Sequence, residues 1–201
     1  MASEYTIHVV DDDDAMLDSL LALLEDAGYQ ARSYASAEEL LARGPLEPGC
    51  VVSDIRMPGM DGLALLKKLR ARGDGLPLIL ITGHGDVPLA VAAIKAGASD
   101  FLEKPFEAEA LLAAVNGGLQ QQSGASARKE DMEAAAHRSL TMLTPREREV
   151  LERLVAGDSN KEAAQKLGVS HRTVEFHRAH ILEKTGAKGL PDLVRLWLAA
   201  A

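Results

Sequence analysis

Val51-Val52-Ser53-Asp54-Ile55-Arg56-Met57-Pro58-Gly59-Met60-Asp61-Gly62 is the stretch that decides the fold of the first half of the chain. A short apolar strand ends at an acidic residue. A loop that contains glycine and proline then leads into residues 63–72, whose leucines recur at helical spacing. The stretch therefore predicts one β–α unit with a carboxylate at the carboxyl end of its strand.

The same alternation of short apolar strands and longer amphipathic segments recurs through residues 1–122. The predicted strands are Thr6–Val10, Tyr29–Tyr34, Val51–Ser53, Leu78–Thr82 and Asp100–Glu103. The predicted helices are Ala15–Ala27, a short helix capped by Ser36, Leu63–Arg72, Val87–Ala96, and Glu107 to about Gln121. Strands this apolar, separated by helices, indicate a parallel sheet that helices cover on both faces. We therefore predict an α/β domain over residues 1–122.

The last 60 residues show only helical patterns. Thr144-Pro145 begins one helix, and Ser159 or Asn160 caps the next. Gly168-Val169-Ser170 forms a tight turn before a third helix, and Leu190–Ala199 is the fourth. The pattern predicts a separate all-α domain over residues 142–201. The polar stretch around Ser123 marks the boundary, so we interpret residues 123–141 as a linker that is rich in helix formers.

Charge and composition separate the two halves further. Residues 1–122 carry a net charge of −10 (19 acidic against nine basic side chains), whereas residues 123–201 carry +2 (13 basic against 11 acidic). This asymmetry indicates different partners for the two domains. We expect no membrane association, because no apolar run approaches the roughly 18 residues of a membrane helix. The single cysteine, Cys50, and the lack of a secretory signal favour a cytoplasmic location.

Polar side chains follow four of the five predicted strands. Asp11 and Asp12 follow the first strand, Asp54 the third, Thr82 ends the fourth, and Lys104 follows the fifth. Because the carboxyl ends of parallel strands meet at one edge of a sheet, these side chains are expected to converge. Three carboxylates remain ionised together if a hard divalent cation joins them, and oxygen ligands suit Mg²⁺. A carboxylate beside Mg²⁺ and a lysine is suited to phosphoryl transfer.

These motifs resemble the receiver domain of two-component response regulators. The matching pieces are Val9-Val10-Asp11-Asp12, Asp54 to Gly62, Ile81-Thr82-Gly83-His84-Gly85, and Asp100-Phe101-Leu102-Glu103-Lys104-Pro105-Phe106. The resemblance implies a flavodoxin-like (βα)5 fold and a phosphoryl group transferred to Asp54 by a sensor histidine kinase.

The resemblance also implies individual residue roles. Asp11, Asp12, Asp54 and the backbone carbonyl of Arg56 would hold Mg²⁺ or Mn²⁺. Thr82 and Lys104 would bind the phosphoryl oxygens, and Phe101 would be the aromatic side chain that changes rotamer. The Lys104–Pro105 peptide bond would be cis. We interpret the His84-Gly85-Asp86 stretch as an exposed turn and not as a metal site.

A short helix, a tight turn and a longer helix form the helix-turn-helix pattern. Residues 142–201 resemble the LuxR-type helix-turn-helix, and the two domains together resemble the FixJ-type regulators. Lys161, Arg172, Arg178 and Lys184 are candidates for phosphate contacts, with Asn160 and Thr173 as hydrogen-bonding helpers. Glu175 is a candidate for a cytosine amino group and Phe176 for a thymine methyl group. Glu175 could instead only orient a neighbouring arginine. The resemblance adds His177 to this DNA-contacting set.

Together these features predict a response regulator that controls transcription and is not an enzyme, apart from slow loss of its own phosphoryl group. Phosphorylation would promote homodimerisation, or uncover the DNA-binding domain, and so favour binding to double-stranded promoter DNA; RNA polymerase is a further candidate partner. One alternative is a constitutive DNA-binding regulator with a non-switching receiver. A Mg²⁺-dependent phosphatase is the other, but Arg56 stands where such enzymes usually need a second carboxylate.

Overall fold

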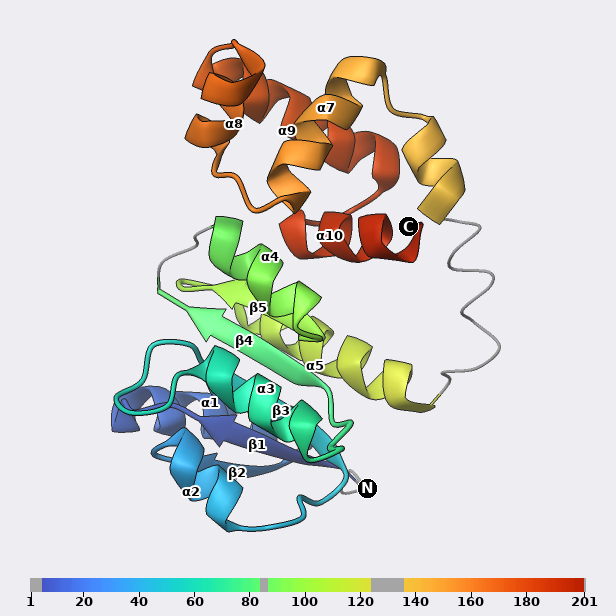
Figure 1. The fold of residues 1–201 in the computed structure, drawn as a ribbon. Coiled ribbons are helices and arrows are strands. Elements are labelled where there is room, and N and C mark those ends of the chain that lie inside the picture. Colours follow the sequence, from blue (N-terminus) through green and yellow to red (C-terminus); the bar gives the residue numbers. More distant parts are fainter. Residues whose placement is uncertain (1–4, 84–86, 124–135, 201) are drawn as a thin grey trace. The chain divides into compact units, whose positions relative to one another are not determined.

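The computed structural model describes residues 5–83, 87–123 and 136–200 (Figure 1). The predicted α/β domain contains five strands: β1 (Thr6–Val10), β2 (Gln30–Tyr34), β3 (Gly49–Asp54), β4 (Leu78–Thr82) and β5 (Asp100–Glu103). The helices between and after them are α1 (Asp14–Asp26), α2 (Ala37–Ala42), α3 (Gly62–Ala71), α4 (Val87–Lys95) and α5 (Ala108–Ser123). All neighbouring strands pair in parallel, in the order β2-β1-β3-β4-β5. This architecture confirms the predicted (βα)5 fold.

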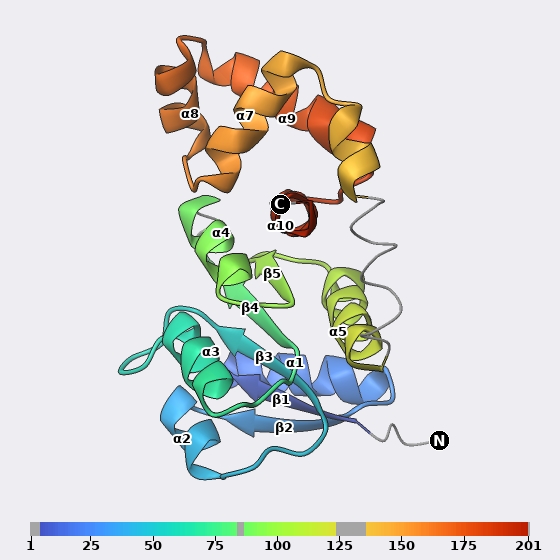
Figure 2. The same cartoon turned by 45° about the vertical axis from the view of Figure 1, so that its right-hand side comes forward.

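Helices cover both faces of this sheet, which explains why its central strands are rich in apolar residues. Figures 1 and 2 show α1 and α5 on one face and α2 and α3 on the other. The first face buries alternate strand residues against Leu17, Leu20 and Leu111. Alternation of side chains along each strand sends the intervening residues to the α2 and α3 face. The β1, β3 and β4 strands are therefore buried at every position.

Side-chain caps begin the helices that follow β1, β2 and β3. Asp13 accepts hydrogen bonds from the backbone of Ala15 and Met16 at the start of α1. Ser36 caps α2, as predicted, and Asp61 accepts from Ala64 N at the start of α3. These carboxylate and hydroxyl oxygens satisfy backbone N–H groups that have no partner within the helix. The caps therefore determine where the loops at the carboxyl ends of β1 and β3 stop.

The C-terminal part is helical over its described residues, without a strand. It contains a short helical segment over residues 136–141 and four longer helices: α7 (Pro145–Val155), α8 (Asn160–Leu167), α9 (His171–Thr185) and α10 (Leu190–Ala199). Val150, Leu151, Leu154, Val174 and Leu193 form its buried centre. Four of these helices were predicted. Thr144 and Ser170 cap α7 and α9, and Ser159, one of the two predicted candidates, caps α8. In the proposed linker, residues 124–135 lie outside the described residues, and the domain limits 1–122, 123–141 and 142–201 remain predictions.

None of the helices in the described ranges combines the length and apolarity needed to cross a membrane.

Candidate functional site: an acidic sheet edge and a helix-turn-helix

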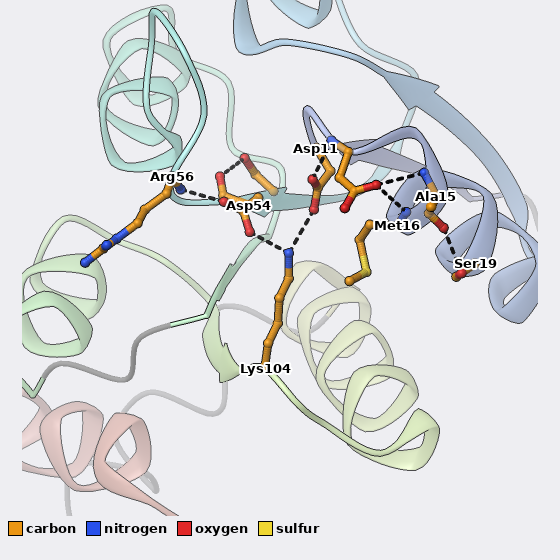
Figure 3. A network of polar contacts seen from close by, with 9 residues as sticks. Asp11, Ala15, Met16, Ser19, Asp54, Arg56 and Lys104 are labelled. Atoms are coloured by element: carbon orange, nitrogen blue, oxygen red, sulfur yellow. Dashed lines mark hydrogen bonds and ion pairs between the residues drawn. The ribbon is translucent and has the colours of Figure 1, made fainter.

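Asp11, Asp54 and Lys104 meet at the carboxyl edge of the sheet (Figure 3). The Lys104 Nζ atom donates to Asp11 Oδ2 at 3.0 Å and to Asp54 Oδ1 at 2.7 Å. The two aspartates are only 2% and 7% exposed. Burial of Lys104 disfavours its charge, but its hydrogen bonds to Asp54 and Asp11 outweigh this effect and raise its pKa. One ammonium group thus compensates two buried carboxylates whose strands, β1 and β3, are direct neighbours.

The second oxygen of each carboxylate is held by the backbone two residues further along. Asp54 Oδ2 accepts from Arg56 N at 2.5 Å, and Asp11 Oδ1 accepts from Asp13 N at 3.0 Å. Both side chains therefore have one oxygen on their own loop and one on Lys104 (Figure 3). This arrangement orients both carboxylates towards the Lys104 ammonium group, so no direct contact between the two carboxylates is required.

Two further strands of this edge, β4 and β5, contribute Thr82 and the segment around Lys104. Thr82 is fully buried at the end of β4, and its carbonyl accepts from Lys104 N at 2.7 Å. Phe101 on β5 is buried, with 8% of its surface exposed. The Lys104–Pro105 peptide bond is cis. The backbone at the end of β5 is therefore hydrogen-bonded to β4 at the position from which the Lys104 side chain extends towards the acidic residues.

The carboxylates at this edge suit a hard cation better than a soft one, because Mg²⁺ prefers oxygen ligands and commonly uses one or two carboxylates with several waters. Asp11 and Asp54 supply two such groups. Asp12, the third predicted carboxylate, is exposed. Within the described residues, no three His, Cys, Asp or Glu side chains come together as a metal site. The donor set present here thus consists of two converging carboxylates and the neighbouring backbone.

The loop between β3 and α3 contains a residue contact that the sequence patterns did not predict. Gly59 has a φ angle of +77°, a left-handed conformation that glycine adopts readily. Beside it, Met60 N donates to Glu38 Oε1 at 3.0 Å, so a side chain of α2 reaches the loop that follows Asp54. No spacing rule indicates this contact, because the helix and the loop are distant in sequence.

The helices α8 and α9 form the predicted helix-turn-helix. Gly168 ends α8 in the left-handed conformation, with φ of 65°, and the Ser170 side chain accepts from Thr173 N at the start of α9. Val174 and Ile181 are buried on the inner face of α9. Arg172, Glu175 and Phe176 are exposed, and Phe176 exposes 57% of its surface.

The predicted DNA-contacting residues differ in how they are held. Lys161 and Arg172 are exposed, whereas Arg178 is half-buried. Lys184 donates to the buried carboxylate of Glu147 at 2.7 Å, so it has an intradomain partner. The side-chain oxygen of Asn160 is buried and has no hydrogen-bond partner among the described residues.

Three further residues of α9 take part in local side-chain contacts. Glu175 Oε1 lies 3.6 Å from His171 Nδ1, one helical turn away. The ring of Phe176 lies 4.1 Å from that of His180, centroid to centroid, and 5.9 Å from that of His177. The Thr173 hydroxyl lies 2.8 Å from the Ser170 hydroxyl at the cap of the helix. Phe176 is therefore an exposed aromatic side chain with a histidine packed against it.

Comparison with known proteins assigns both parts of the chain. Residues 7–116 match the response regulator receiver domain, and residues 141–197 match the bacterial regulatory proteins of the luxR family. The chain is 49% identical over 201 residues to the transcriptional regulatory protein FixJ of Azorhizobium caulinodans, a match that covers 100% of this chain and 95% of the relative. The chain belongs to the FixJ-type response regulators.

Two further relatives place this response regulator in the same family. The C4-dicarboxylate transport transcriptional regulatory protein DctR of Rhodobacter capsulatus is 43% identical over 195 residues, covering 96% of this chain and 98% of the relative. Full-length FixJ from B. japonicum has a crystal structure with a TM-score of 0.58 and 44% identity, covering 99% of this chain and 98% of that one.

These FixJ-type relatives confirm the predicted family and the combination of a receiver with a LuxR-type DNA-binding domain. Their names describe transcriptional regulators, which is consistent with the prediction that this response regulator is not an enzyme. Asp11, Asp54 and Lys104 come together as expected in its receiver. The His84-Gly85-Asp86 stretch lies outside the described residues.

Proposed function

We propose that this response regulator accepts a phosphoryl group on Asp54 from a sensor histidine kinase and thereby gains affinity for promoter DNA. The observation that supports the proposal best is the buried pair Asp11 and Asp54 with Lys104 between them. A cluster of this kind at the carboxyl edge of a parallel sheet is typical of a ligand site. Burial of the charges carries a desolvation cost, which favours a functional role over a purely structural one.

In the transfer step, a carboxylate oxygen of Asp54 attacks the phosphorus atom. The new P–O bond forms as the P–N bond to the kinase histidine breaks, and the imidazole leaves with the bonding electron pair. Asp11, Asp12, Asp54 and the Arg56 carbonyl would hold Mg²⁺ or Mn²⁺, which supplies positive charge against the charge on the transferring oxygens. Lys104 supplies a second positive charge from the end of β5, and Arg56 N keeps the other Asp54 oxygen oriented.

The phosphoryl group would then alter the receiver through Thr82 and Phe101. It adds about −1.5 to −2 charges and strong hydrogen-bond acceptors. Thr82 ends a strand beside the acidic residues, so its hydroxyl can turn to the phosphoryl oxygens. The space that Thr82 leaves would admit Phe101, which changes the surface of the receiver beside β5.

That surface change would promote dimerisation or release the DNA-binding domain. A single helix-turn-helix makes few phosphate contacts, whereas two linked domains bind with a higher effective concentration. In the bound state α9 would enter the major groove, with Glu175 and Phe176 near base edges and with Lys161, Arg172 and Arg178 near phosphates.

Light scattering tests the proposal on the wild type and Asp54→Asn, with and without Mg²⁺ and beryllofluoride. We expect a dimer only for the wild type with both additions, together with tighter binding to promoter DNA. Equal DNA affinity of both proteins under all conditions would instead support a constitutive regulator with a non-switching receiver. If the wild type binds beryllofluoride and stays monomeric while its DNA affinity rises, activation proceeds by release of the DNA-binding domain.

A further inference from the structure

The carboxylate of Glu38 on α2 contacts the backbone of the loop that follows Asp54. We propose that Glu38 is a positioning residue, which holds the β3–α3 loop in the shape that presents Arg56 and Asp54 to the cation and the phosphoryl group. This inference rests on the proposed phosphorylation of Asp54. It concerns a residue of α2 that contacts neither group.

The geometry around Gly59 and Met60 supports this role. Glu38 Oε1 accepts from Met60 N at 3.0 Å. A Cβ atom at Gly59 would lie 3.0 Å from the same Glu38 oxygen, which is tighter than ordinary packing. The absence of a side chain at Gly59 therefore allows the carboxylate to approach the backbone of the loop closely.

Both ends of this loop are attached to the sheet and to α3. At the first end, Arg56 N donates to Asp54 Oδ2. At the second end, Gly62 N donates to Ile55 O at 3.0 Å, and Asp61 caps α3. Glu38 adds a fixed point between these ends, close to the residues whose backbone would contact the cation. A rotation of the loop about its two ends would move the Arg56 carbonyl, and the Glu38 contact opposes such a rotation.

Glu38 itself is carried by a turn that is well anchored. Ala37 and Leu40 on either side are fully buried, and the Ser36 side chain caps the helix. The neighbouring Glu39 has a different task, because its Oε2 atom accepts from Ala35 N at 2.8 Å within the start of α2. Two adjacent, exposed glutamates of one short helix thus contact different backbones, which provides a matched control.

The test uses the full chain with Glu38→Ala, Glu38→Gln and Glu39→Ala. The first readout is hydrogen exchange of the loop peptide that contains Met60, without metal. The second is Mn²⁺ affinity, measured from the paramagnetic resonance signal of free Mn²⁺, with Asp54→Asn as the reference for specific binding. Neither readout depends on a kinase or on DNA.

We expect Glu38→Ala to accelerate exchange at Met60 and to weaken Mn²⁺ binding about three- to tenfold, the size expected for one net hydrogen bond. Glu38→Gln should stay close to the wild type, because its amide oxygen can still accept from Met60 N. Glu39→Ala removes the same charge from α2 and should leave both readouts unchanged.

Two results would overturn the positioning role while leaving Asp54 as the phosphoacceptor. One is unchanged exchange at Met60 in Glu38→Ala. The other is faster exchange with Mn²⁺ affinity equal to that of the wild type. If the wild type itself shows no Mn²⁺ binding that depends on Asp54, the proposed function fails and this inference fails with it, and the wild-type titration alone distinguishes that case.

Discussion

Lys184 on the recognition helix α9 donates a 2.7 Å hydrogen bond to Glu147 in the first turn of α7. Glu147 is 3% exposed, and the same carboxylate accepts from both the backbone N–H and the hydroxyl of Thr144. A single buried side chain therefore caps one helix and fixes the position of another. The contact joins α9 to α7 well beyond the N-terminal cap of α9, and it adds to the packing of the buried Val174 and Ile181.

The Glu147 carboxylate makes the stability of the helical domain depend on pH. The hydrogen bond from Lys184 is the main cause that lowers its pKa from 4.5 to about 2, against the opposing effect of burial. Because the pKa is lower in the folded state, the carboxylate stabilises the fold fully above pH 4.5, and this contribution is lost as the pH falls towards 2. Thermal unfolding followed by Trp197 fluorescence should show this loss in the wild type and a flatter profile in Glu147→Gln. Equal pH profiles of the wild type and Glu147→Gln would show that Glu147 does not cause the loss of stability.

Replacement of Lys184 should lower the stability of the helical domain, whatever its effect on DNA contacts. Lys184→Ala leaves the buried Glu147 carboxylate without its cation, and we expect a loss of about 2 kcal/mol in the free energy of unfolding. The estimate is modest because 33% of the Lys184 side chain is exposed and water screens the pair. Urea unfolding of the two single variants, Lys184→Ala and Glu147→Gln, and of the double variant measures their coupling. Strictly additive losses would show that the contact contributes nothing.

Phe176 should discriminate thymine from uracil in the DNA site. Its exposed ring, packed on His180, is suited to contact a thymine methyl group, which contributes about 0.8 kcal/mol, or roughly fourfold in affinity. We expect deoxyuridine in place of the contacted thymine to weaken wild-type binding by that factor and to leave Phe176→Ala unaffected. A binding site selected from random DNA serves for the titration. Arg172→Ala is the control, since loss of a phosphate contact should weaken binding to both DNAs alike and reduce the salt slope by about one.

Gly62 should not tolerate a side chain, because a Cβ atom there would lie 2.3 Å from the Asp54 carbonyl oxygen and 2.9 Å from Leu80 Cδ2. Gly62→Ala should therefore displace the end of β3 and cost about 1–3 kcal/mol in the free energy of unfolding. Tyrosine fluorescence reports on this domain, since all three tyrosines lie before residue 35. Gly75→Ala is the control, because its Cβ atom would meet nothing within 4 Å. A Gly62→Ala protein as stable as this control would refute the steric argument.

Local patterns predicted the elements that local forces determine. Apolar runs such as Leu78–Thr82 correspond to strands that are buried at each position, and Leu190–Ala199 is a helix with the predicted limits. The caps Ser36, Thr144 and Ser170 follow from hydrogen bonds between residues three positions apart, so sequence spacing is sufficient to find them. Ends of other elements shift by a residue or two, as in α1, which was predicted over Ala15–Ala27 and runs from Asp14 to Asp26.

The sequence by itself determined the family, the order of strands and helices, and the convergence of Asp11, Asp54 and Lys104, because parallel strands bring their carboxyl ends to one edge. Only the tertiary structure decided which atoms meet there. It placed Lys104 between the two carboxylates, brought Glu38 to the backbone of Met60, and paired Lys184 with Glu147. Contacts of this kind join residues distant in sequence, and their geometry depends on how whole elements pack, so no periodicity along the chain encodes them.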